Sequence, residues 1–330
     1  MTDLTKGATA GRLHWLDWMK LFSIVAIIWG HFFSAGHVYL YLFSVQAFCI
    51  ISGFLYKKAP DWKTCLEKNF WQLLVPTLLL SVAMHLEAMM RAWSLGLTYS
   101  ISWPRFFYYL LKGYHWCMGP CWFFYMLFII RIIMQLLPQH RLVHGVLFVL
   151  LSGGSIGIHL SGIDIANAWV NVLVCMPMFL LGVFLQPLRE WLTRLHNYKF
   201  EVVLSVLAVA IILFCGEYNG YVWMYRCGYG NSFLLFVVGA LGGIMLLYVV
   251  SLWACRLLYS SIVEKLSSGS ILIVGVHIII VRRLMELPNR TWGEDLLFSL
   301  MILLVFYPII ILTERYCPIL LGQYRRKGKV

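Results

Sequence analysis

The chain has 330 residues, of which 61% are hydrophobic and only 12% are charged, about half the charged share of a typical soluble domain. One soluble core cannot bury so much apolar surface, so the composition excludes an ordinary soluble protein and predicts a surface that faces lipid. The net charge of +12 does not indicate nucleic acid, because the cytoplasmic loops of membrane proteins collect lysine and arginine.

Apolar segments long enough to cross a hydrocarbon layer about 30 Å thick follow one another along the chain. A polar leader, 1–13, comes first without a signal-peptide cleavage site. The aromatic stretch 101–113 is too short to span, and we expect it to lie along the membrane interface. The ten predicted spans are 15–35, 38–56, 70–90, 118–136, 142–160, 167–186, 200–216, 231–251, 267–284 and 295–315.

These spans predict one all-α polytopic membrane domain over 1–330, with short loops and a basic tail over 318–330. If the N-terminus is cytoplasmic, most of the 26 lysines and arginines lie in the loops and span ends of that side. The positive-inside rule is then obeyed, and ten spans place both termini in the cytoplasm. The membrane topology therefore explains most of the excess of lysine and arginine over acidic residues.

Three ionisable residues lie in the first predicted span, where such groups are costly and indicate function. Asp17, Lys20 and His31 fall on one helical face at about 100° per residue. We expect Asp17 and Lys20, three residues apart, to pair near the cytoplasmic end. His31 lies about 16 Å beyond Lys20 and suits proton transfer. The structural alternative, in which Lys20 snorkels and His31 only packs, stays open at this point.

Two further predicted spans carry polar groups. Ser270 and His277 are seven residues apart and share a helical face, which suggests that His277 and the histidine of the first span line one cavity. In the third span His85 is followed by Glu87 and Arg91, which have the spacing of a salt bridge. These three residues either contribute to a site or only mark the outer end of that helix.

The fourth predicted span begins among aromatic residues and ends at Arg131, which we expect to anchor the helix on the cytoplasmic side. Trp116 and Trp122 have two readings, as interface belt residues or as platforms for a sugar ring. The nine cysteines form no CxxC pair, so we expect no metal site, while a disulfide between Cys215 and Cys227 stays open. No phosphate-binding loop or GxSxG element occurs, and histidine acid–base chemistry remains.

Several separated motifs, taken together and in this order, resemble the acyltransferase-3 family of integral membrane acyltransferases. Lysine at position 20, where most members carry arginine, is similar to the fucose 4-O-acetylase-like branch. The residues that carry the resemblance are Asp17, Lys20 and His31; Ser52, Gly53 and Phe54; Trp122, Phe123 and Phe124; Pro177, Phe179 and Gly182; and Ser270 with His277.

The resemblance implies transfer of an acetyl group from acetyl-CoA, a co-substrate and not a bound cofactor, to a hydroxyl of a glycan or lipid-linked sugar. His31 is the expected catalytic base or, alternatively, the residue that is acylated. Asp17 and Lys20 are expected to support it, with Lys20 and Arg131 near the phosphates of CoA. The expected substrate-binding residues are His277, Ser270, Ser52, Trp122, Glu87 and Arg91.

The partners implied are therefore the acyl-CoA donor, the sugar acceptor and the lipid bilayer, with a homo-oligomer left open. The expected location is the inner membrane of a bacterium. Two other functions are retained. A transporter with an intramembrane path through His31, His277 and Lys20 would show inverted repeats and interrupted helices, and neither is evident in the sequence. A relative that has lost catalysis would serve as a sensor or partner.

Overall fold

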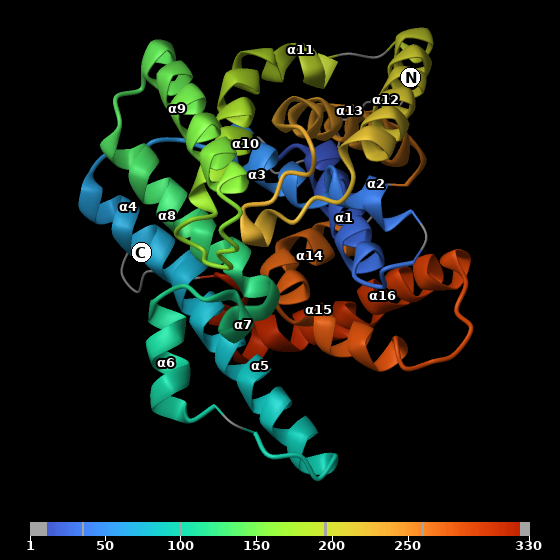
Figure 1. Cartoon of the computed structure of the whole chain (residues 1–330). Coiled ribbons are helices and arrows are strands. Elements are labelled where there is room, and N and C mark those ends of the chain that lie inside the picture. Colours follow the sequence, from blue (N-terminus) through green and yellow to red (C-terminus); the bar gives the residue numbers. More distant parts are fainter. Residues whose placement is uncertain (1–11, 35, 100, 195–196, 259–260, 324–330) are drawn as a thin grey trace.

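The protein is described here by a computed structural model that covers residues 12–34, 36–99, 101–194, 197–258 and 261–323. All regular elements in these ranges are helices (Figure 1). They are α1 (His14–Gly30), α2 (His37–Tyr41), α3 (Ser44–Phe54), α4 (Trp62–Asn69), α5 (Val75–Ser94), α6 (Trp103–Leu111), α7 (His115–Met118), α8 (Trp122–Leu136), α9 (Arg141–Leu160), α10 (Val172–Leu185), α11 (Arg189–Arg194), α12 (Tyr198–Asn219), α13 (Phe233–Leu257), α14 (Ser261–Ser268), α15 (Ser270–Leu284) and α16 (Trp292–Tyr316).

Within the described ranges, eight helical segments are long and apolar enough to cross a membrane, and a ninth is formed if α14 and α15 count as one span. The predicted all-α polytopic fold is thus confirmed, and the chain is an integral membrane protein. The short stretch 101–113 forms the nine-residue helix α6, which buries Phe106 and Leu110 on one face.

The first predicted span, 15–35, is wrong at its C-terminal end. Helix α1 has 17 residues and stops at Gly30, with His31 as its C-cap. The chain then turns through Phe33 and Gly36, which have φ angles of 53° and 89°. Seventeen residues rise about 26 Å, so α1 falls just short of the candidate spans in length. His31 therefore lies at a helix end, not within a helix.

The ninth predicted span, 267–284, is interrupted where a continuous helix was expected. Helices α14 and α15 meet at Gly269 with a bend of 78°. A side chain at Gly269 would overlap Ile310 of α16, so the close approach of α16 requires glycine at the break. This bend lets α14 contact the start of α1 while α15 runs beside the end of α1.

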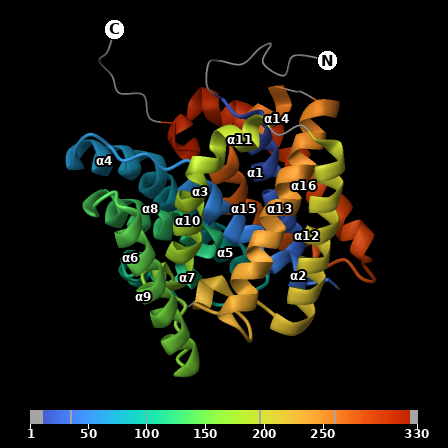
Figure 2. The same ribbon diagram turned by 90° about the horizontal axis from the view of Figure 1, so that it is seen from above.

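Helix α1 lies inside the bundle and contacts α2, α3, α13, α14, α15 and α16 (Figure 2). Its Ser23 is fully buried and donates to the Met19 carbonyl oxygen, 2.7 Å away. The polar face of α1 is thus enclosed by protein and withdrawn from lipid. The end of α1 is therefore a suitable position for a functional site, because an enclosed helix end can hold a reactive side chain in a fixed position.

Glycines bring α3 and α10 into close contact beside α1. A Cβ atom on Gly53 would overlap the carbonyl oxygen of Phe179, and one on Gly182 would overlap that of Ile50. Small residues allow membrane helices to approach this closely. The Ser-Gly-Phe and Pro-x-Phe-x-x-Gly motifs therefore meet each other, and their glycines serve helix packing.

Candidate active site

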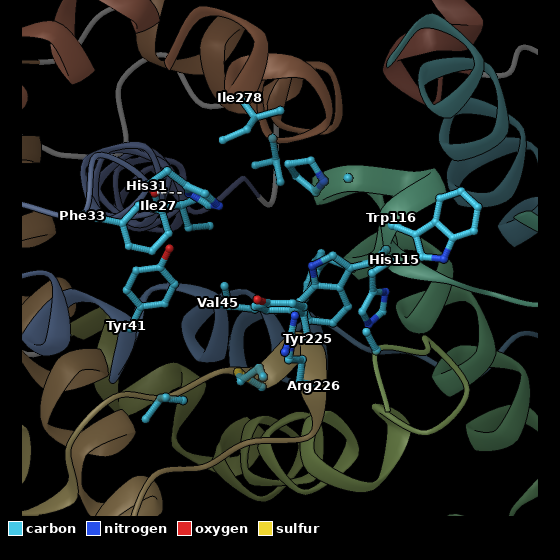
Figure 3. A pocket seen from close by; sticks show the side chains of 18 of the residues that line it. Ile27, His31, Phe33, Tyr41, Val45, His115, Trp116, Tyr225, Arg226 and Ile278 are labelled. Carbon is cyan, nitrogen blue, oxygen red and sulfur yellow. Dashed lines mark hydrogen bonds between the residues drawn. The ribbon is translucent and has the colours of Figure 1, made fainter. Parts of the chain in front are cut away.

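A cavity of about 570 Å³ lies where α1 ends. Its walls come from α2, α3, α7, the start of α8, the loop after α12, and α15 (Figure 3). Eight aromatic rings line the cavity, those of Phe33, Tyr41, Phe48, Trp116, Trp122, Phe123, Tyr221 and Tyr225. Such walls suit a sugar ring, whose faces are apolar and whose edge carries hydroxyls.

His31 borders this cavity, and the hydrogen bonds of its ring define its tautomer. Its Nδ1 lies 2.6 Å from the Ile27 carbonyl oxygen. A carbonyl oxygen only accepts, so Nδ1 carries the proton in the neutral ring and donates it to Ile27. Nε2 then holds a free lone pair. That nitrogen is the atom of His31 able to act as a base.

His277 meets His31 from α15, but it does not line the cavity that the sequence predicts the two histidines to share. Its Nδ1 lies 3.1 and 3.0 Å from the carbonyl oxygens of Ile273 and Val274, so Nδ1 is protonated and Nε2 accepts. Nε2 is 3.5 Å from His31 Nδ1, and the ring centroids are 5.0 Å apart. His277 is fully buried and does not line the cavity, so it lies behind His31.

Asp17 is buried near the start of α1, but the expected pair with Lys20 does not form. Its Oδ2 accepts from Arg12 Nε at 2.7 Å, and its Oδ1 accepts from Ser267 Oγ at 2.6 Å. Arg12 precedes the helix and turns back over its first turn, so both carboxylate oxygens of Asp17 are already occupied. Asp17 fastens α1 to α14 and does not reach the cavity.

Lys20 is close enough to Asp17, Arg12 and Arg131 to interact with them electrostatically. Arg131 points into the bundle from α8, where its Nη1 donates to Asn69 Oδ1 at 3.3 Å. The expectation that Arg131 ends the span as a cytoplasmic anchor is therefore wrong, because α8 continues to Leu136. We call Lys20, Arg131 and Asn69 the inner polar cluster. Along α1 it lies about 16 Å from His31.

Glu87 and Arg91 of α5 pair with residues at the end of α15 and not with each other. Arg91 Nη2 is 3.1 Å from Glu286 Oε1, and Arg283 is 3.9 Å from Glu87. The predicted Glu87–Arg91 salt bridge is thus wrong, because both side chains turn towards the end of α15. Neither residue borders the cavity, and both serve to join α5 to α15.

Of the remaining predicted substrate-binding residues, Trp122 alone borders the cavity. It is 9% exposed, so the belt interpretation is wrong for Trp122. Ser52 lies on α3 and Ser270 begins α15, about 10 Å along the helix from His277, and neither serine lines the cavity. The thiols of Cys215 and Cys227 are free, so the open disulfide does not form.

Several cavity residues did not stand out in the sequence. His115 begins α7 and accepts a 2.6 Å hydrogen bond from Asn171 Nδ2. Its position at the start of an apolar segment was a usable signal. Burial raises the pKa of Tyr221 to about 12, so its hydroxyl stays protonated and able to donate. Arg226 and Arg282 also line the cavity, and nothing in the sequence distinguishes them from the other basic residues.

Comparison with known families gives one match, to the acyltransferase domain of the acyltransferase-3 family, over residues 13–315. The match covers nearly the whole chain, from the start of α1 to the end of α16. No curated protein and no solved structure matches the chain.

Proposed function

The chain belongs to the acyltransferase-3 family of membrane acyltransferases, and we propose that it moves an acetyl group from acetyl-CoA to a hydroxyl of a glycan or lipid-linked sugar. The observation that carries the proposal is His31, which borders an aromatic cavity and is backed by His277 at 3.5 Å. The inner membrane of a bacterium is the proposed location. The family match supports acyl transfer, and the aromatic walls support a sugar acceptor.

In the proposed reaction His31 acts as the general base. Its Nε2 takes the proton of the acceptor hydroxyl while that oxygen attacks the thioester carbonyl. The tetrahedral intermediate then collapses, the acyl group stays on the acceptor oxygen, and the departing CoA thiolate takes the proton from His31. His277 Nε2 accepts from His31 Nδ1 and stabilises the positive charge that the ring gains.

The inner polar cluster is the proposed place for the phosphates of the donor. Lys20 and Arg131 add two positive charges there, against the single carboxylate of Asp17, which already binds Arg12 and Ser267. Acetyl-CoA carries its thioester at the far end of a pantetheine arm. A separation of about 16 Å between Lys20 and His31 suits a donor that binds by its phosphates and reacts at its other end.

The first test is transfer of labelled acetyl from acetyl-CoA into membrane glycans and lipids by the wild type and by His31→Ala. We expect transfer to fall by about 10²–10⁴-fold in the variant, which is the usual contribution of a general base. His140→Ala is the matched control, since His140 is exposed in the loop before α9. Full transfer by His31→Ala would discard His31 as the base.

The same experiment separates two alternatives. Acylation of His31 itself would leave a labelled protein when the acceptor is withheld, and direct attack would not. A transporter is the second alternative, because the break at Gly269 is a feature expected of transporters. Absence of both transfer and acetyl-CoA binding in the wild type would favour the transporter.

A further inference from the structure

The cavity beside His31 is lined by positive charge and by no carboxylate. Its lining residues include two arginines, Arg226 and Arg282, and neither aspartate nor glutamate. Arg226 is compensated from outside the lining by Asp164, whose Oδ2 lies 2.7 Å from Nη1. Arg226 also lies over the rings of Trp223 and Tyr225, at 5.1 and 5.4 Å. The positive charge of Arg226 is therefore already compensated within the protein.

Arg282 differs from Arg226 and from its own neighbour in the chain. Arg283 lies 3.9 Å from Glu87 and 4.0 Å from Glu286. In the part of the chain that the structure describes, Arg282 forms neither an ion pair nor a hydrogen bond, although it is close enough to His31 to interact electrostatically. Arg282 is exposed, and as a cation without a counter-ion it creates a positive potential at the cavity that attracts anions.

A second, smaller cavity of about 60 Å³ extends the site on the far side of Arg282. Arg282, Trp116 and Gly119 border both cavities. The small cavity also touches Tyr99 and His85, whose hydroxyl and Nδ1 share a 2.9 Å hydrogen bond. No carboxylate lines this cavity either. Arg282 therefore borders both the aromatic cavity and this second, smaller cavity, which we call the recess.

We infer that the acceptor carries an anionic group, a carboxylate or a phosphate, and that this group binds Arg282 at the entrance of the recess. The inference rests on the proposed acyl transfer, and it adds the chemical class of the acceptor. The anion supplies the missing counter-charge and makes charge-assisted hydrogen bonds with the guanidinium. The sugar ring then lies against the aromatic wall, with a hydroxyl directed to His31.

The position of Arg282 assigns the anion to the acceptor and not to the donor. Arg282 and His31 border one cavity, and Arg282 follows His277 by five residues, about 7.5 Å along α15. In acetyl-CoA the diphosphate is separated from the thioester by the whole pantetheine arm. A donor that reacts at His31 therefore holds its phosphates far from Arg282, whereas an acidic sugar has its charge within one ring of its hydroxyls.

The test measures binding to the purified full chain in lipid nanodiscs by isothermal titration calorimetry. The probes are methyl glucuronide, glucosyl phosphate, the neutral methyl glucoside and the adenosine bisphosphate head of CoA. We expect an anionic sugar to bind more tightly than methyl glucoside. Arg282→Gln should weaken that binding by about ten- to a hundredfold, the effect of a lost hydrogen bond to a charged group, and Arg283→Gln, the matched control, should leave it unchanged.

The probes also separate the sources of the anion. Preference for methyl glucuronide identifies an acidic sugar, and preference for glucosyl phosphate identifies a phosphate-linked one. Equal binding of charged and neutral sugars, or unchanged binding by Arg282→Gln, would overturn the inference. Loss of binding of the adenosine bisphosphate in Arg282→Gln would assign the arginine to the donor and overturn it as well.

Failure of the proposed reaction gives a different result. His31→Ala should keep the binding of the anionic probe while it loses acetyl transfer, because Arg282 and not His31 holds the anion. If the wild type binds the anionic sugar through Arg282 but transfers no acetyl group, the proposed function fails and the anion site remains.

Discussion

At the scale of single residues, the two histidines of the site differ in what their ring nitrogens contact. His31 donates from Nδ1 to a carbonyl of its own helix, which leaves Nε2 free at the cavity. His277 donates from Nδ1 to two carbonyls of α15 and directs Nε2 to His31. In the proposed reaction His31 is therefore the base at the cavity, and His277 is a positioning residue behind it.

This difference predicts how a change at His277 affects the reaction. His277→Leu should lower kcat by about ten- to a hundredfold, because a buried hydrogen bond to His31 is lost at about 1–3 kcal/mol. The acceptor KM should hardly change, since His277 does not line the cavity. His277→Gln should recover part of kcat, because its amide oxygen can accept from His31. Steady-state kinetics with varied acceptor check all three points.

The pattern of kinetic changes would identify another role for His277. A raised acceptor KM with an unchanged kcat would place it in contact with the substrate. Equal losses in His277→Leu and His277→Gln would indicate that the site needs the imidazole itself.

At the scale of helices, the contact of α3 with α10 depends on two glycines. Gly53→Ala should lower the free energy of unfolding by about 1–3 kcal/mol, because the new methyl group overlaps the Phe179 carbonyl and forces the helices apart. Thermal unfolding in detergent, followed by size-exclusion chromatography, checks this.

The matched control for that change is Gly145→Ala on α9. A Cβ atom there meets no other atom within 4 Å, and alanine suits a helix interior better than glycine by about 0.5–1 kcal/mol. The control should therefore unfold at the same temperature as the wild type or slightly above it. Equal behaviour of the two variants would mean that the close helix contact contributes little to stability.

At the scale of the whole molecule, contacts at the two ends of α1 align this helix with α14 and α15. Asp17 bonds to Ser267 at one end of α1, and His31 meets His277 at the other. An ion pair between Lys265 of α14 and Glu314 joins the end of α16 to the end of α1 that carries Asp17. The cavity lies at the second end, which the distribution of lysine and arginine predicts to lie outside the cytoplasm.

This orientation predicts which surface positions react with a membrane-impermeant maleimide added to intact cells. Ser161→Cys, exposed at the cavity end, should be labelled, and Lys57→Cys, exposed at the opposite end, should be labelled only after the membrane is opened. Seven native cysteines are buried, and the half-buried Cys255 and Cys317 lie towards the cytoplasmic end, so the background should be low. Labelling of Lys57→Cys in intact cells would reverse the assigned orientation.

The sequence alone determined the fold class, most of the spans and the meeting of two intramembrane histidines. Apolar runs and helical spacing carry this information, because lipid leaves a spanning segment little choice but a helix. The same local rules could place Asp17, Lys20 and His31 on one face, but they could not tell which partners each would meet.

The tertiary structure alone decided those partners. Asp17 binds Arg12 and Ser267 instead of Lys20, and Glu87 and Arg91 turn to α15 instead of to each other. The break at Gly269 and the uncompensated charge of Arg282 likewise depend on how distant helices pack. Spacing along one helix shows which side chains could pair. Which of them do pair depends on the helix that packs closest, and the periodicity of a single segment contains no information about that packing.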